Sequence, residues 1–329
     1  MTVRVYRSTD ASAPVLSGTA GALIGVLDGC LVTGYGAQVN SGWTKPFTGT
    51  NLASYRQGTG SNQFYLKVRD DAPGAGGAIE ARFRGFEVMT TVTATDTAAD
   101  GTNIFPTIVQ STATQTAVRK SATADATVRP WIVVADARTF YLFILTGDTV
   151  GVYYSVMFGE FYSFKTNDPG RCIIGVRTAE NTIAAINDPD RLVSLGNVVA
   201  GGATSIFIMA RDHTGLPGAV PCSLMGRADT STSSSSVAIA MSGNLSYTNQ
   251  PDHKGYLAPL RIHNGSLTNT NIRGRVRGLW NWQHLITTVS DGETFTGSGN
   301  LAGKTFMVIK QTPNAGVWVV EISDTWDTN

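Results

Sequence analysis

Charged residues are scarce in this chain. Lys, Arg, Asp and Glu make up 15% of its 329 residues, whereas about 25% is typical of a soluble domain. The formal net charge of +1 argues against non-specific binding to nucleic acid, because such binding needs clustered Lys and Arg to displace counterions. No apolar run approaches the roughly 18 residues that a membrane helix requires. We therefore expect neither nucleic acid nor a membrane as a partner.

Cysteine is also rare. Cys30, Cys172 and Cys222 lie far apart and form no C-x-x-C pair. An odd, scattered set of cysteines indicates reduced thiols made in a cytoplasm, and it argues against a disulfide framework or a zinc site. Residues 1–7 lack the apolar core of a signal peptide and are typical of a strand.

The motifs of common enzyme sites are missing. The chain has no G-x-S-x-G elbow, no phosphate loop and no H-E-x-x-H sequence. The glycines of residues 74–77 lack the third glycine of a dinucleotide fingerprint and lie in a predicted hairpin loop. The sequence therefore predicts no enzymatic activity and no cofactor.

Candidate metal and acid–base residues are present but poorly placed. None of the four histidines has metal-ligand spacing, so surface or strand-end positions are the favoured interpretation. Three pairs of aspartates could act as glycosidase carboxylates or calcium ligands. Each pair falls in a predicted loop, where Asp commonly stabilises turns. The pairs are Asp70 with Asp71, Asp96 with Asp100, and Asp188 with Asp190.

Hydrophobic residues, in contrast, reach 42%, which is enough for a substantial core. β-Branched and aromatic runs bounded by turn residues recur along the chain, most densely in residues 129–164, where we expect a meander buried on both faces. Residues 18–31 have an apolar helical face, with Ser17 as N-cap and Gly34 as a stop. The fold class predicted is mainly β, an antiparallel sandwich or barrel-like architecture with one short N-terminal helix.

One hairpin pattern occurs twice. Residues 64–69 and 79–89 form one predicted hairpin, and residues 256–262 and 272–280 form another. Both return on Arg-x-Arg-Gly followed by an apolar residue, which suggests two related β halves. A division into an N-terminal part, residues 1–115, and a C-terminal part, residues 116–329, follows from this pattern, although one domain would also accommodate it.

The return strands supply the candidate interface residues. Alternation along a strand places Ile272, Val276, Trp280 and Trp282 on one predicted face and arginines on the other. These arginines could pair with acids of a neighbouring subunit, or they could form a solvated face with partners across the sheet. The two tryptophans could pack in the core, form a contact between subunits or stack on sugar rings. The full candidate set is Arg82, Arg84, Arg273, Arg275, Arg277, Trp280 and Trp282.

Several segments together resemble a widespread family of virion structural proteins of tailed bacteriophages and prophages. The similar stretches follow one another along nearly the whole chain: residues 3–10, 13–16, 31–36, 42–47, 81–87, 118–121, 129–136, 151–154, 272–280 and 301–306. The resemblance implies a part of the virus particle, made in the bacterial cytoplasm, without a catalytic motif. It does not specify a position in the particle.

Three functions are compatible with these observations. We expect first a non-enzymatic virion component that assembles by oligomerisation with copies of itself and other virion proteins, preferably in the tail or baseplate. A capsid decoration protein is the close alternative. The third is a carbohydrate-binding module for host adsorption, which implies a glycan of the host surface as partner.

Overall fold

The structure is a computed structural model. It describes residues 1–71, 79–94, 98–106, 117–148, 150–151, 153–175, 207–225, 257–264, 271–282, 289–310 and 317–326. The described part is mainly β with one short α-helix, and every pairing between its strands is antiparallel. The predicted fold class is confirmed.

The strands form a long sheet and a smaller one. The long sheet has 13 strands. Its main path is β1 (Arg4–Arg7), β8 (Trp131–Ala135), β9 (Thr139–Leu145), β10 (Tyr153–Glu160), β12 (Cys172–Gly175), β13 (Phe207–Arg211), β14 (Pro217–Met225), β15 (Leu257–Asn264), β16 (Asn271–Trp282), β19 (Val317–Glu321), β18 (Thr305–Lys310) and β17 (Thr294–Thr296). Off this path, β11 (Tyr162–Ser163) pairs with β16.

The smaller sheet has six strands. Its order is β2 (Thr44–Gly49), β3 (Leu52–Arg56), β4 (Tyr65–Arg69), β5 (Glu80–Met89) and β6 (Gly101–Phe105), with β7 (Ala117–Arg119) also on β5. Strand β1 joins the long sheet through β8, and β7 joins the smaller one through β5. The parts before and after residue 115 therefore each give a strand to the sheet that the other part dominates.

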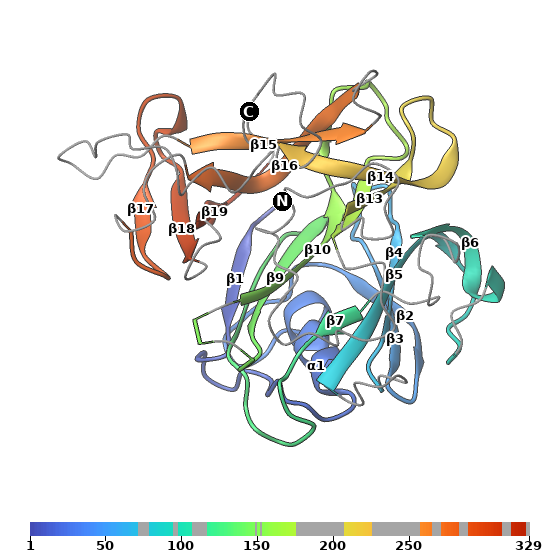
Figure 1. Ribbon diagram of the computed structural model, residues 1–329, viewed down its shortest axis with the longest axis vertical. Helices are drawn as coiled ribbons and strands as arrows, with labels where there is room; N and C mark the ends of the chain where they lie inside the picture. The colour runs from blue at the N-terminus through green and yellow to red at the C-terminus, as the bar shows by residue number, and fades with distance from the viewer. Residues whose placement is uncertain are drawn as a thin grey trace.

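The middle of the long sheet is buried on both faces, as predicted for the meander. Along β9, Phe140, Leu142 and Ile144 enter a core shared with the smaller sheet and the helix. The alternate residues Tyr141 and Phe143 enter a second core, shared with the C-terminal strands. Figure 1 shows β9 and β10 in the middle of the molecule, with α1 (Ala22–Leu27) toward the bottom and β15 and β16 at the top. The β-sandwich is thus extended by a further layer.

The predicted helix forms, but it starts later than expected. α1 has Gly21 at its N-cap, continues as a π-helical turn over Asp28–Thr33, and ends at Gly34, whose φ is 78°. Ser17 was the wrong N-cap: the carboxylate of Asp70 accepts hydrogen bonds from the Leu23 and Ile24 amides instead. A side chain at the end of β4, distant in sequence, thus satisfies the exposed amides of the helix.

Both predicted hairpins are present. β4 pairs with β5 in the smaller sheet, and β15 pairs with β16 in the long sheet. Their occurrence in different sheets leaves the duplication a prediction. The strand-like run at 160–164 was assigned to the meander, but β11 leaves it and pairs with β16. The segment around Asp96 and Asp100 was predicted to be a loop, yet Ala98–Asp100 form a 3-10 turn and β6 follows directly.

Candidate interaction surface beside β11 and β16

Many of the chain's few charges lie inside the protein and are paired there. Five pairs of described residues have both side chains no more than 4% exposed. They are Lys67 with Asp100, Arg82 with Glu80, Lys120 with Asp70, Arg273 with Asp168, and Arg277 with Asp136. A buried charge is costly unless it is paired and hydrogen-bonded. The interior therefore depends on these pairings being complete.

The arginines of the first hairpin belong to this interior. Arg82 is 2% exposed and Arg84 1% exposed. An Arg82 nitrogen lies 3.1 Å from Glu80, and Arg84 donates to the carbonyl oxygen of Pro106 at 3.0 Å. Their side chains are covered by other parts of the same chain. They therefore form neither a solvated face nor a free surface that could contact a neighbouring subunit.

Two arginines of the second hairpin are buried in the same manner. Arg277 donates to both carboxylate oxygens of Asp136, at 2.6 and 3.1 Å. Arg273 donates to Asp168 at 2.8 Å. Burial opposes ionisation of Asp168, but its hydrogen bonds with Ser163, the Gly170 amide and Arg273 outweigh that effect and lower its pKa. The expected acidic partners exist, yet they come from other parts of the same chain.

A bulge at Gly278 corrects the predicted faces of β16. Gly278 has φ 65°, and the register with β15 shifts between Pro259 and Arg261. The alternation changes there, so Val276 and Leu279 share the second core. Trp280 and Trp282 instead lie with a separate cluster around Phe306. A Cβ at position 278 would stand 2.2 Å from the Trp326 indole, so the glycine both turns the strand and makes room for a ring.

The two candidate tryptophans differ in exposure. Trp282 is 2% exposed and meets Phe295 edge-on at 5.7 Å between ring centroids. It is a core residue and not a surface contact. Trp280 is partly buried, and its indole nitrogen lies 3.4 Å from Glu321, which also binds Lys304 at 3.0 Å. An interface role for Trp280 stays a prediction.

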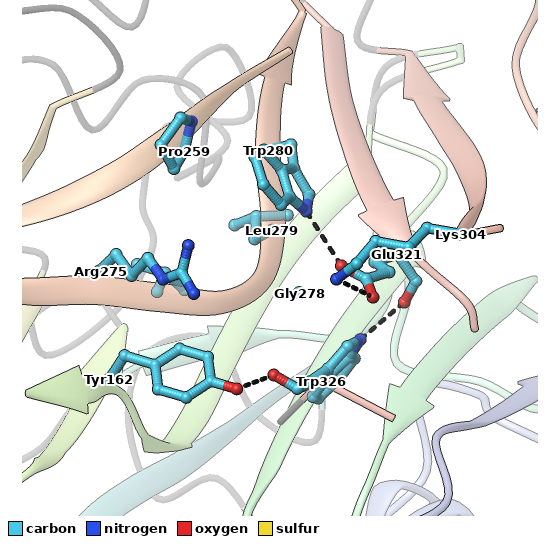
Figure 2. A pocket seen from close by; sticks show the side chains of 10 residues that line it. Tyr162, Pro259, Arg275, Gly278, Leu279, Trp280, Lys304, Glu321 and Trp326 are labelled. Carbon is cyan, nitrogen blue, oxygen red and sulfur yellow. Dashed lines mark hydrogen bonds and ion pairs between the residues drawn. The ribbon is translucent and has the colours of Figure 1, made fainter. Parts of the chain in front are cut away.

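Arg275 is the candidate arginine that remains partly exposed. Its guanidinium lies 4.8 Å from the centre of the Tyr162 ring, a cation–π stack. Tyr162 also donates its hydroxyl hydrogen to the backbone oxygen of Trp326. Figure 2 shows Arg275 beside the Tyr162 ring, with Trp326 and Glu321 on the opposite wall of the pocket. The stack holds the arginine in place without neutralising its charge.

Two hollows adjoin this stack. One, of about 360 Å³, is lined by Tyr162, Ser163, Phe164, Pro259, Arg261 and Arg275. The other, of about 180 Å³, is lined by Arg138, Glu160, Phe161, Tyr162, Ser163, Lys165, Arg171 and Arg277. Among these described residues Glu160 is the single carboxylate. It is 1% exposed and lies 3.1 Å from Arg171. The combined surface is strongly basic and partly aromatic.

Sequence reasoning missed much of this surface. Phe164 is 62% exposed, and its amide donates to the Arg273 carbonyl at 2.9 Å, next to Ile272, which is 45% exposed. These contacts depend on β11 pairing with a strand more than a hundred residues away. The aromatic run at 161–164 was visible, but nothing in it indicated its partner strand.

The other candidate groups offer little chemistry in the described part of the chain. No group of three or more His, Cys, Asp or Glu there could hold a metal ion. Asp70 and Asp100 bind buried lysines and do not simply support turns. Asp96, Asp188 and Asp190 fall outside the described residues. The three cysteines are free, as predicted, and the structure shows that all three are buried, which raises the pKa of each thiol.

A search with protein-family models and a search of curated proteins find no match to this chain. No helix among the described residues has the length and apolarity needed to cross a membrane. Support for a function therefore comes from the resemblance noted above and from the surface beside β11 and β16.

Proposed function

We propose that this chain is a non-enzymatic structural component of a tailed-phage particle, associated with the tail or baseplate, which assembles with copies of itself and other particle proteins. The observation that supports the proposal most directly is the basic, aromatic surface beside β11 and β16. There Phe164, 62% exposed, adjoins the partly exposed Arg275 in one hollow. Aromatic and Arg side chains are enriched where proteins bind each other.

The distribution of charge adds support. Pairs such as Arg277 with Asp136 and Lys120 with Asp70 remove charges from the surface into the interior. Charged residues make up only 15% of the chain, and these pairs withdraw part of that charge from solvent. Depletion of charge is a property of the buried centre of protein interfaces. A subunit that covers much of its surface with neighbours suits this composition.

The carbohydrate-binding alternative is less well supported. Stacking on sugar needs an open aromatic face, yet of the two tryptophans that suggested it, Trp282 is 2% exposed and Trp280 is partly buried. The Phe164 ring is exposed, but its hollow is lined by no described Asp, Glu, Asn or Gln that would bind sugar hydroxyls. The Tyr162 ring is covered by the Arg275 and Arg277 guanidinium groups, at 4.8 and 5.8 Å from its centre. Capsid decoration, in contrast, would use the same kind of surface as a tail contact, so only the position in the particle separates these two.

Cryo-electron microscopy of particles from the phage or prophage that encodes this chain tests the proposal, combined with mass spectrometry of the same preparation. A ring or trimer of this fold at the tail is the expected result. Density on the capsid lattice would replace the tail position by decoration. Purified particles that contain none of this chain would overturn a structural role altogether.

A further inference from the structure

The charge of Arg275 is not neutralised by any described carboxylate. The Arg275 guanidinium lies over the face of the Tyr162 ring, and the backbone of Arg275 pairs with β11 and β15. The flanking arginines at 273 and 277 each bind a buried aspartate. Within one strand, therefore, two arginines complete the interior and the one between them presents a fixed guanidinium to the hollow.

The surroundings of Arg275 define what could occupy this hollow. Arg261, on the adjacent strand, is exposed, and it lines the same cavity of about 360 Å³ as Phe164. In the adjoining hollow of about 180 Å³, Lys165 is exposed, while Glu160 is already held by Arg171 and lies within 3.9 Å of Arg138. The cavity thus combines an apolar ring with an excess of positive charge.

We propose that this hollow docks an acidic segment of a neighbouring virion protein. A carboxylate of that segment binds the Arg275 guanidinium, assisted by Arg261, and an apolar side chain next to it covers Phe164. Arg binds carboxylates through two parallel hydrogen bonds, and the Tyr162 stack orients it for this. The inference rests on the proposed function and adds the surface and the chemistry of the partner.

A polyanion without apolar groups fits this site less well. Phe164, which lines the hollow, is 62% exposed, and a bound nucleic acid backbone or sulfated chain would leave its aromatic surface in water. The net charge of +1 also provides no general attraction for such polymers. An acidic peptide segment with apolar residues satisfies both features of the hollow at once.

Charge reversal tests the docking site. Arg275→Glu should lower the number of copies of this chain in purified particles by about tenfold or more, because it places like charges across the contact. Arg56→Glu is the matched control: Arg56 is also partly buried and stacks on a tyrosine, 5.2 Å from the Tyr65 ring, but in the smaller sheet. Its incorporation should stay near that of the unaltered chain. Equal incorporation of Arg275→Glu and Arg56→Glu would overturn the inference.

Folding and function are separated by two further measurements. Arg275→Gln removes the charge while keeping a polar side chain, and it should show the same direction of effect with a denaturation midpoint no lower than that of Arg56→Gln, which loses the equivalent tyrosine stack. Binding of a synthetic peptide of alternating Glu and Leu should weaken in Arg275→Glu and in added salt, whereas a Lys–Leu peptide should not bind. If the chain is present in particles and Arg275→Glu enters them normally, the docking site is wrong and the structural function stands. If particles lack the unaltered chain, the proposed function fails first.

Discussion

The hairpins β4–β5 and β15–β16 carry the same Arg-x-Arg-Gly sequence on their return strands, and they use it differently. In the first hairpin the ladder is regular through Gly85, and both arginines are buried. In the second, Gly278 has φ 65° and the strand bulges, so the pattern of burial changes along it. Arg275 is then partly exposed between two buried arginines. The same Arg-x-Arg-Gly motif thus lies in a closed sheet face in the first hairpin and borders a charged surface in the second.

The residues that surround the two glycines explain why only the second strand bulges. A Cβ at Gly85 would lie 2.4 Å from the Phe105 ring, which comes from the neighbouring β6. A Cβ at Gly278 would lie 2.2 Å from the indole of Trp326, which comes from the segment after β19. Both glycines make room for an aromatic ring, but only the second also needs a left-handed backbone. The surroundings of the strand, and not the motif, decide whether the ladder continues.

The largest effect is expected from breaking a buried pair in either hairpin. Arg277→Met leaves the Asp136 carboxylate buried without its cation, and Lys67→Met does the same to Asp100. Each should lower the free energy of unfolding by about 3–5 kcal/mol, measured by chemical denaturation. Adding Asp136→Asn to Arg277→Met should restore most of the loss, because the remaining amide can still accept from the Arg138 and Thr139 amides. A much smaller loss in one hairpin would show that its interior is not dependent on charge pairing.

The two glycines should respond differently to the same substitution. Gly85→Ala should cost about 1–3 kcal/mol through overpacking against Phe105. Gly278→Ala should cost about 1–2 kcal/mol more, since it adds a strained φ to the clash with Trp326. A double-mutant cycle separates the two terms. In a Phe105→Leu background the cost of Gly85→Ala should largely disappear, whereas a smaller residue at position 326 should leave the backbone cost of Gly278→Ala. Full recovery at both positions would mean that the bulge is unstrained.

Acid should affect the two regions with opposite sign. The pKa of Asp168, in the second hairpin's network, is lowered from 3.8, so its stabilisation is present above that pH and is lost as the pH falls below it. Burial raises the pKa of Asp70 above 3.8, despite Lys120 and the amides of α1, so its ionisation costs stability as the pH rises from 3.8 toward the raised value. Denaturation midpoints between about pH 3 and about pH 6 check this. Asp168→Asn should flatten the acid loss, and Asp70→Asn should remove the opposing slope. Parallel curves for the two variants would contradict these directions.

The sequence was informative where local pattern decides structure. The β-branched and aromatic runs over 129–164 predicted strands buried on both faces, and β9 and β10 are buried almost throughout. The two Arg-x-Arg-Gly hairpins were also predicted correctly as hairpins. The missed features depend on contacts between distant residues. Asp70 caps α1 from β4, β11 pairs with β16, and Asp136 and Asp168 neutralise arginines of β16. No spacing within one segment encodes such partners.

The candidate surface, too, could be predicted from the local sequence only in part. Alternation along 272–282 predicted one apolar and one cationic face, but a single left-handed glycine at 278 breaks that alternation. Trp282 became core, and of the arginines only Arg275 kept a partly open position. A glycine in a strand pattern signals a bulge or a close approach. Gly85 and Gly278 show that it does not tell which of the two will form.

The smallest stability effect is expected from the arginine–tyrosine stack that each hairpin's sheet contains. Arg56 lies over Tyr65 at 5.2 Å and Arg275 over Tyr162 at 4.8 Å, and both arginines are partly exposed. Arg56→Met and Arg275→Met should therefore each lower the free energy of unfolding by only about 0.5–1 kcal/mol, measured by urea denaturation. The two stacks should be equivalent for folding, because neither cation neutralises a buried acid. A loss at Arg275 as large as that at Arg277 would show that Arg275 belongs to the interior network, and the contrast between a closed and an open hairpin would fail.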